Sequence, residues 1–435
     1  MSDLPPHSGL SRGAGHMLRA LTMRVLTPVV TRALLTWEFC EAGVAYNPTS
    51  AQVRKNPYPI YDRLRRKDPA HRMRLGGAWI LSRYEDCNVV LRDHKRFRSY
   101  DPDYGGASHR VQVMLDLDPP DHTRLRALVS LAFTPRTIAR LTPRIRCIAD
   151  ELLDALAETP RFDLMADFAY PLPITVIAEL IGVPPSDMDV FKGWSRDLAL
   201  SIEPLINDEQ LRRVERSNKE LYAYFERMIE RRRHDPGDDF ITSLLAAEEE
   251  GDRLTRDELI GTLMLLLVAG HETTQNLIGN GLLALLRHPD QLQRLRDHPD
   301  QIELAVNELL RYDSPVQFVR RYVAEEVEIG GKRILAGQSL LCLVGAANHD
   351  PSVFTDPHLL DIGRREQSHL SFGRGVHYCL GSALATLEAR IAFTALLRHF
   401  SAIRLAAEPR YRKQIVLRGP EELWLAVERA PQPAL

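Results

Sequence analysis

A cysteine enclosed by glycines, directly before a helical segment, is the residue of this sequence best suited to bind a metal. Cys379 lies in residues 372–381, FGRGVHYCLG, and an uninterrupted helical pattern starts at Leu380. A metal-bound thiolate is stabilised by backbone N–H groups and by the positive end of a helix. Gly375 can adopt the left-handed conformation that turns such amides toward the sulfur. The alternative is an inert cysteine beside a glycine turn, since buried free cysteines are common.

This decapeptide resembles the haem-binding loop of the cytochromes P-450, and four other segments follow the order of that family's motifs. The resemblance extends over about residues 45–430 and implies haem b with Cys379 as the axial iron ligand. In such a site Phe372 would shield the sulfur from water, and His377 would reach a haem propionate. Gly381 would let the helix lie close under the flat macrocycle.

The segment Glu308-Leu309-Leu310-Arg311 matches the E-x-x-R helix of the family. A spacing of three residues places the carboxylate and the guanidinium on one helix face, where they can form a bidentate pair. By itself the motif is weak, because exposed helices produce it as a solvated pair. Here it precedes the cysteine by 379 − 311 = 68 residues. The resemblance implies a structural cluster beneath the haem, with Arg364 as its third member and Arg365 as the competing candidate.

A Glu-Thr pair follows an apolar run in a segment that the sequence predicts to be a long helix. Thr255 and Glu258 form the pattern of a capping box, and the run GTLMLLLVAG is too short to cross a membrane. Burying Glu272 and Thr273 is costly unless they are hydrogen-bonded or used in the reaction. The resemblance makes them the acid–alcohol couple that delivers protons during dioxygen activation. The alternative is a polar surface cluster.

Small residues precede this pair, and basic residues elsewhere match the family's propionate ligands. Ala269 and Gly270 would leave room for dioxygen beside the cofactor. The family match assigns three further cofactor contacts: His122, Arg126 and Arg321. His122 and Arg126 are one helical turn apart and can face one anion, although such a pair alone is more often solvated. Arg320 competes with Arg321, and strand alternation should point only one of the two inward.

The substrate pocket is placed by position in the family pattern alone. Its expected walls are apolar: Leu266, Ala269, Val316, Val319, Val416 and Leu417, with part of residues 98–114. Gln317 and Tyr100 would add polar contacts. These residues predict a largely apolar ligand such as a terpenoid, steroid, fatty acid or polyketide, although each side chain would be equally satisfied in an ordinary core.

The elements around these motifs predict a mainly α fold with small β-sheets. Helices dominate from Thr123 to about residue 320, and short strands are expected around 73–81, 322–329 and 339–344. The resemblance implies the cytochrome P-450 fold, with haem between a long central helix and the helix after the cysteine loop. Residues 45–435 are expected to form one domain.

Residues 1–44 are expected to form a separate cationic arm. No acidic residue lies between Asp3 and Glu38, while arginines recur there: Arg12, Arg19, Arg24 and Arg32. The arm is expected to be mobile or loosely docked. The alternative is a cationic helix lying on a membrane surface or a partner, with Pro28 interrupting it.

Composition narrows the possible compartments and partners. The formal charge is −2, with 56 basic and 58 acidic residues, so nothing indicates nucleic acid. The five cysteines form no C-x-x-C pair, which argues against zinc, c-type haem and a disulfide scaffold and favours the cytoplasm. The family resemblance implies a monooxygenase that uses dioxygen, and we expect a monomer. Electrons would come from a separate ferredoxin and an NAD(P)H-dependent reductase. The alternatives are a haem-thiolate enzyme that inserts no oxygen and a haem sensor.

Overall fold

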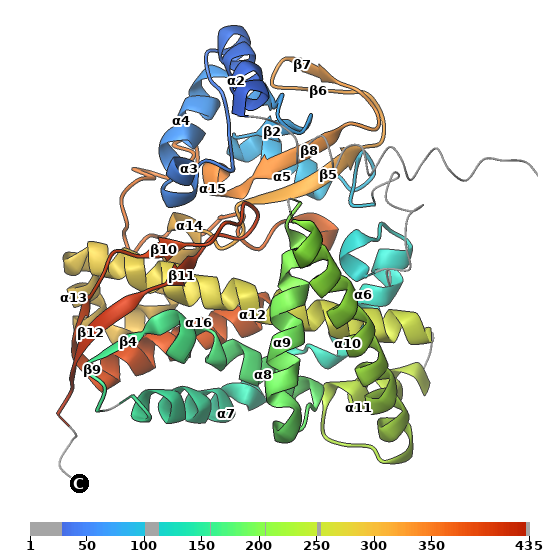
Figure 1. Cartoon of the computed structure of the whole chain (residues 1–435), viewed down its shortest axis with the longest axis vertical. Coiled ribbons are helices and arrows are strands. Elements are labelled where there is room, and N and C mark those ends of the chain that lie inside the picture. The colour runs from blue at the N-terminus through green and yellow to red at the C-terminus, as the bar shows by residue number, and fades with distance from the viewer. Residues whose placement is uncertain (1–27, 101–112, 157, 205, 250–253, 432–435) are drawn as a thin grey trace, which may run out of the picture.

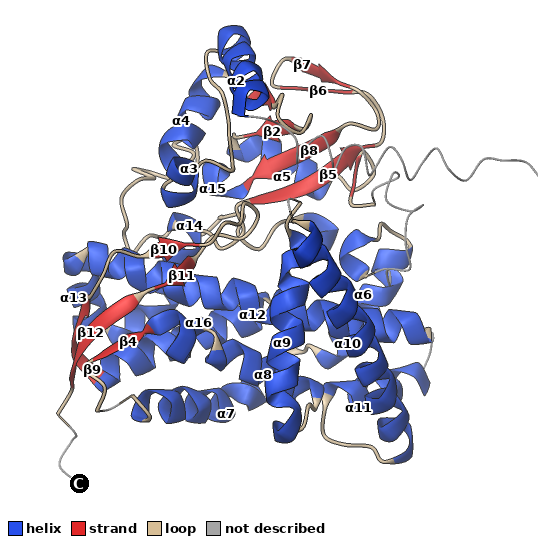
Figure 2. Ribbon diagram, in the orientation of Figure 1, coloured by secondary structure: helices blue, strands red, loops and turns tan. Residues whose placement is uncertain are grey.

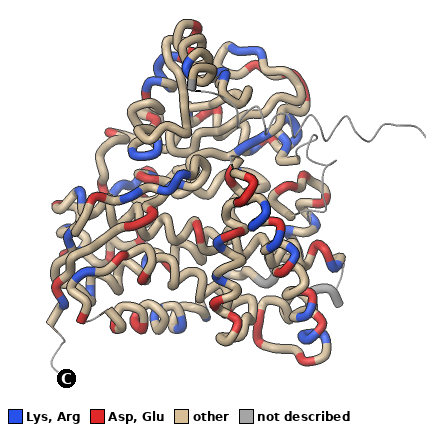
Figure 3. The backbone as a smooth tube through the Cα atoms, in the orientation of Figure 1, with Lys and Arg blue, Asp and Glu red and all other residues tan. Residues whose placement is uncertain are grey.

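Helices form most of the molecule, and small sheets lie at its edges (Figure 2). The computed structural model describes residues 28–100, 113–156, 158–204, 206–249 and 254–431. A large helical part occupies the lower portion of Figure 1, and a smaller part built on a five-stranded sheet lies above it. Figure 3 shows both signs of charge distributed through both parts, in keeping with the near-zero net charge.

The helices of the described residues agree with the mainly α prediction. Proline residues start several of them because the first turn needs no N–H donor. Pro171, for example, is the first residue of α8. In chain order the α-helices of the described residues are α2 (Pro28–Ala42), α3 (Ala51–Lys55), α4 (Tyr58–Lys67), α5 (Tyr84–Arg92), α6 (Asp121–Ala132), α7 (Pro135–Asp154), α8 (Pro171–Ile181), α9 (Met188–Ala199), α10 (Asp208–His234), α11 (Phe240–Glu249), α12 (Arg256–Arg287), α13 (Pro289–Asp297), α14 (Ile302–Tyr312), α15 (Val344–Ala347) and α16 (Ser382–His399).

The strands form the predicted small sheets. The region around 73–81, where a short strand was expected, belongs to a hairpin of β1 and β2, with positive φ at Gly76 and Gly77 in its turn. The largest sheet has the order β1-β2-β8-β5-β3, and the sheet β4-β12-β9 closes the C-terminal edge. The strands of the described residues are β1 (Ala70–Arg72), β2 (Trp79–Leu81), β3 (Phe97–Arg98), β4 (Arg161–Asp163), β5 (Phe318–Val323), β6 (Val327–Ile329), β7 (Lys332–Ile334), β8 (Ser339–Leu343), β9 (Phe400–Leu405), β10 (Arg410–Tyr411), β11 (Pro420–Glu422) and β12 (Trp424–Arg429).

Helix α12 is the axis of the helical part. Its 32 residues start at the predicted capping box, in which Thr255 and Glu258 each bond the other's backbone N–H. At 1.5 Å per residue the helix is about 48 Å long. It packs against α8, α14 and α16, so it lies beside the helix that follows Cys379. Among the described residues, no helix has the length and apolar character needed to cross a bilayer.

The N-terminal boundary differs from the prediction. Pro28 is the first described residue of α2, and Glu38 on this helix is buried. Its Oε1 lies 2.7 Å from Nε2 of His71 and accepts the N–H of Tyr46 at 2.6 Å. Its Oε2 accepts the N–H of Arg74 at 2.9 Å. The predicted arm over 1–44 is therefore corrected: residues 28–44 contact the rest of the fold, and residues 1–27 lie outside the described residues.

We expect removal of Glu38 to weaken the fold even though it lies in the predicted arm. Glu38→Ala leaves the buried His71 imidazole and two backbone N–H groups without their acceptor, at about 1–3 kcal/mol for an unsatisfied buried group. The measurement is the free energy of unfolding in denaturant. Glu41→Ala is the matched control, because Glu41 lies on the same helix, half-exposed beside Arg74. Equal stability of both variants would contradict this role of α2.

Candidate active site

The loop before α16 is shaped by a glycine in the left-handed region. Gly375 has φ +69°, and a Cβ there would lie 2.6 Å from the carbonyl oxygen of Leu91. Only glycine fits both the conformation and this close approach. The N–H of Cys379 donates to the carbonyl of Phe372 at 2.9 Å. The chain therefore reverses over the loop and places Cys379 at the start of α16, as the sequence predicted.

Opposing effects act on the Cys379 sulfur. Part of the Cys379 residue is exposed to solvent. Its thiol, however, is surrounded by protein atoms, and this burial raises the thiol pKa. The N–H groups of Gly381 and Ser382 and the charge of Arg126 lower that pKa without fully offsetting burial. A bound metal would complete the shift to thiolate, because a coordinating thiol loses its proton. A Cβ at Gly381 would have no neighbour within 4 Å, so the space over this helix end is open to a flat group.

Four basic side chains converge beside this loop. The rings of His122 and His377 are 4.1 Å apart, and Nη2 of Arg126 donates to the carbonyl of Tyr378 at 2.6 Å. Arg321 is buried at 6% exposure, whereas Arg320 is exposed, so Arg321 is the inward member of that pair.

The electrostatics of this cluster indicate an anionic ligand. Burial, and then the charges of Arg321, His122 and Arg126, lower the pKa of His377 to about 3. Burial and then Arg126 lower the pKa of His122 to about 4. Both ring nitrogens of His122 are buried without a hydrogen-bond partner. A dianion such as a pair of haem propionates would relieve the repulsion and supply an acceptor to His122, so these residues fit the group.

One face of helix α12 carries a stripe of residues that are less buried than the rest of the helix. Ala269 is exposed, and Leu266 and Thr273 are half-buried, whereas most of the helix is buried. Their spacing of three and four residues places them on one face. The hydroxyl of Thr273 donates to the carbonyl of Ala269 at 2.9 Å, a hydrogen bond to the preceding turn of its own helix. Gly270 differs from its expected role: a Cβ there would lie 3.2 Å from Ile177, so its small size serves the packing of α8.

Glu272 does not face Thr273 but is held in a buried ionic contact. Nη1 of Arg412 donates to Oε2 of Glu272 at 2.5 Å, and Nε2 of His271 lies 3.5 Å from Oε1. Burial would raise the pKa of Glu272, but His271 and then Arg412 lower it to about 2. His271 is itself held by the carbonyl of Leu267 at 2.8 Å and by Ser195. No motif in the sequence pointed to Arg412, because its segment carries no recognisable spacing.

The predicted charge cluster beneath the site is present. Glu308 accepts from Nε of Arg311 at 2.7 Å and from its Nη2 at 2.8 Å, a bidentate pair that is almost fully buried. Nε of Arg364 lies 3.1 Å from Oε2 of Glu308, so Arg364 is the third member, and Arg365 is exposed. Arg311 also donates to the carbonyls of Asn348 and Pro357, which fixes the loop leading to the cysteine.

The predicted pocket residues separate into two groups. Leu266, Val316 and Val319 are part-buried. Leu417, which forms a β-bridge with Val316, is buried, and so is Val416, which packs in the core with Tyr46 and Ile80. Gln317 is also committed elsewhere, since it accepts from Tyr61 at 2.9 Å and donates to Ser314 at 2.7 Å. Most of the expected loop wall lies outside the described residues, and Tyr100 at its edge is exposed.

Comparison with known proteins agrees with this geometry. A family model described as cytochrome P450 matches residues 190–423. Cytochrome P450 107B1 of Saccharopolyspora erythraea is 42% identical over 401 residues, covering 87% of this chain and 96% of that protein. The chain belongs to the cytochrome P450 family. The vitamin D(3) 25-hydroxylase of Pseudonocardia autotrophica is 42% identical over 84% of this chain and 92% of its own. The crystal structure of P450BioI with hexadec-9Z-enoic acid ligated acyl carrier protein superposes with a TM-score of 0.83 at 41% identity, covering 87% and 100%.

Membership confirms the predicted fold, the haem cofactor and the enzyme class. Cytochromes P450 hold haem iron through a cysteine, and the relatives are named as oxidoreductases of this kind. In this chain Cys379 is the cysteine positioned for that bond. His122, Arg126, Arg321 and His377 would hold the propionates, and Phe372 packs beside the loop, its ring 6.3 Å from that of Tyr378.

We expect Glu308→Ala to lose haem or fold poorly. Removing the carboxylate leaves Arg311 and Arg364 as buried charges without their shared partner, at about 3–5 kcal/mol. Haem content and thermal melting of the purified protein measure the effect. Glu303→Ala is the control, since Glu303 lies on the same helix, exposed, 3.7 Å from Arg390. Full haem content with unchanged melting in both variants would show that the cluster has no structural role.

Proposed function

We propose that this P450 hydroxylates or epoxidises a largely apolar small molecule, using dioxygen and electrons from a separate protein. The observation that carries the proposal is the stripe Leu266–Ala269–Thr273, which presents an alcohol beside small apolar residues. Haem ligated by a thiolate supplies cleavage of the O–O bond, to which the thiolate contributes electron density. Thr273 would donate a hydrogen bond to the dioxygen, and Glu272, the preceding residue, would supply protons.

The substrate class is supported by the apolar side chains and by the relatives. Val316 and Leu417, which pair in a β-bridge, carry no polar side-chain group. One relative is named for hydroxylation of vitamin D(3), and P450BioI was crystallised with a hexadecenoic acyl chain. Both are long apolar molecules. An enzyme without oxygen insertion is the second candidate, and the retained Glu272-Thr273 pair argues against it.

A basic edge beside the cysteine loop supports an external electron donor. Arg92, at the start of residues 92–98, lies against the loop, because a Cβ at Gly375 would be 3.0 Å from Cα of Arg92. This edge exposes basic side chains: Arg92, Lys95, Arg96 and Arg98. We propose that it receives a ferredoxin, reduced in turn by an NAD(P)H-dependent reductase, since opposite charges steer such encounters.

A peripheral membrane contact would involve α2. Several of its large apolar side chains are exposed: Val29, Val30, Trp37 and Phe39. Preceding arginines add positive charge, as a helix lying on an anionic lipid surface requires. We propose that α2 touches the membrane surface without crossing it.

The thiolate assignment has a spectral test. Reduced protein under carbon monoxide is expected to show the red-shifted absorption of thiolate-ligated haem, and Cys379→Ala should abolish it. Cys147→Ala is the control, because Cys147 is exposed on α7, outside the loop. Retention of the band in the Cys379 variant would defeat the assignment.

The role of Thr273 is tested by the coupling of NAD(P)H oxidation to product formation. Positioned proton transfer contributes about 10²–10⁴-fold to rate. Thr273→Ala should keep haem content and substrate affinity but form severalfold less product per NAD(P)H and more hydrogen peroxide. Thr274→Ala is the matched control, because that hydroxyl bonds the carbonyl of Gly270 and is buried. Undiminished coupling in the Thr273 variant would favour a haem-thiolate enzyme that inserts no oxygen over a monooxygenase.

A further inference from the structure

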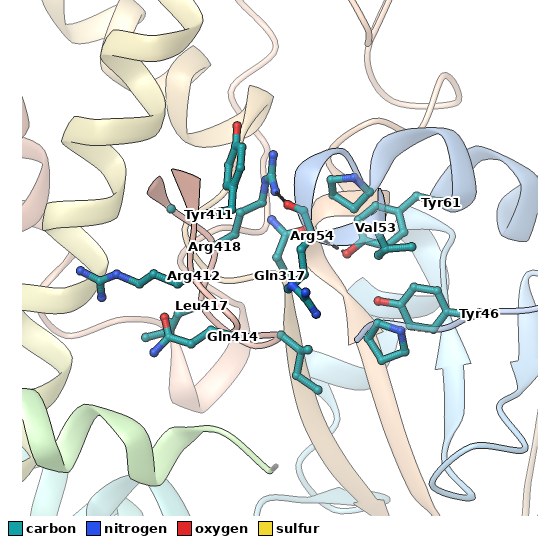
Figure 4. Close-up of a pocket in the computed structure, with 14 residues that line it drawn as sticks. Tyr46, Val53, Arg54, Tyr61, Gln317, Tyr411, Arg412, Gln414, Leu417 and Arg418 are labelled. Carbon is teal, nitrogen blue, oxygen red and sulfur yellow. Dashed lines mark hydrogen bonds between the residues drawn. The ribbon is translucent and has the colours of Figure 1, made fainter. Parts of the chain in front are cut away.

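A small cavity edged by arginines lies between the N-terminal helices and residues 410–419 (Figure 4). Its volume is about 30 Å³, and it is lined by Arg54, Arg412, Gln414, Leu417 and Arg418, among others. A buried water needs about 10–15 Å³ on the same scale, so a group of a few atoms fits. The arginines and Gln414 in the lining suit a polar group and not an apolar one.

The arginines of this cavity differ in how their charge is neutralised. Nε of Arg418 donates to Asp313 at 2.7 Å, and its guanidinium also lies over the ring of Tyr411. Arg54 is half-buried, and it forms no ion pair with a carboxylate of the described residues. Its Nη1 bonds only the neutral carbonyl of Thr49. The cavity therefore has an excess positive charge at Arg54.

Arg412 belongs to the cavity and to the active site at the same time. It lines the cavity, while its Nη1 donates to the buried Glu272 beside Thr273. Figure 4 shows this side chain pointing out of the cavity toward helix α12. Arg412 is 22% exposed and Glu272 only 3%, so the guanidinium is the partner that a ligand can reach.

One apolar residue links the cavity to the residues expected around the substrate. Leu417 lines it and pairs with Val316, one of the part-exposed apolar residues expected to wall the substrate pocket. Gln414 adds a polar group, since its Oε1 is buried without a partner. Half a turn of that amide would present its NH₂ donor to an anion.

We propose that this cavity binds the carboxylate end of an otherwise apolar substrate, with Arg54 and Arg412 as its ligands, and that this contact draws Arg412 away from Glu272. The proposal rests on the proposed function, because it names the substrate class of the same site. Two carboxylates compete for one guanidinium, so substrate binding and the hold on Glu272 oppose each other. Substrate without a carboxylate would leave the Arg412–Glu272 contact intact.

The probes are straight-chain fatty acids of eight to sixteen carbons and their methyl esters, added to the ferric holoenzyme at neutral pH. The optical change on ligand binding gives Kd. We expect at least one acid to bind tenfold or more tightly than its ester. Arg54→Gln should weaken that acid about tenfold and leave the ester unchanged, whereas Arg404→Gln, an exposed arginine on β9 paired with Glu428, should change neither.

The competition itself is tested by a gain of affinity. Glu272→Gln should bind the acid severalfold more tightly, because Arg412 is released for the ligand, and should bind the ester as before. A purely structural role of Glu272 would not tighten one ligand selectively. Haem content and melting confirm that each variant is folded.

Failure of the inference is distinct from failure of the proposed function. Acids that bind no more tightly than their esters throughout the series, or an unchanged acid Kd in Glu272→Gln, would overturn the carboxylate site. The carbon monoxide spectrum and product formation from uncharged substrates would be unaffected by that outcome. Loss of the thiolate band in the unmodified protein would instead refute the proposed function.

Discussion

The gathering of four basic side chains, of which Arg126 and Arg321 carry permanent charge, is the constraint on which the site depends. His122 and Arg126 come from α6, Arg321 from β5 and His377 from the cysteine loop, so three distant segments bring these side chains to one place. The polypeptide itself supplies little negative charge there, chiefly Asp118. An anionic cofactor that binds the folded state and not the unfolded chain stabilises it by mass action. Haem is therefore expected to hold together the junction between the helical part and the sheet.

In the cluster around Glu308, unlike in the basic cluster, the buried charges need no ligand to balance them. There the charges are matched, with one carboxylate between two guanidinium groups and the remaining donors of Arg311 directed to backbone carbonyls. A satisfied buried network fixes one arrangement of the chain, whereas the basic cluster leaves an interaction to be completed by a ligand. The rigid cluster around Glu308 and the positive charge of the basic cluster together determine where a flat dianionic group can lie.

Local patterns predicted the features that depend on neighbouring residues in the chain. The capping box of α12 and the left-handed Gly375 follow from turn chemistry, and strand periodicity predicted that only one of Arg320 and Arg321 points inward. The partners of Glu272 and Glu38 could not be predicted in this way. Arg412 is 140 residues from Glu272, and Glu38 meets His71 across 33 residues. Such contacts depend on the assembled fold, and neither has a motif with a fixed spacing.

The environment of Glu272 limits how it can serve as a proton donor. With a pKa of about 2 the carboxyl is protonated in only about one molecule in 10⁵ at pH 7. A general acid works best when its pKa lies near the operating pH, so the resting contacts oppose proton delivery. If Glu272 is to give up a proton, the contacts that lower its pKa must loosen. His271 is fully buried and bonded to the carbonyl of Leu267, whereas Arg412 is partly exposed and attached to the irregular segment after β10. Movement of Arg412 disturbs the least structure and would remove part of the effect that lowers the pKa of Glu272, while His271, whose effect is larger, would remain in place.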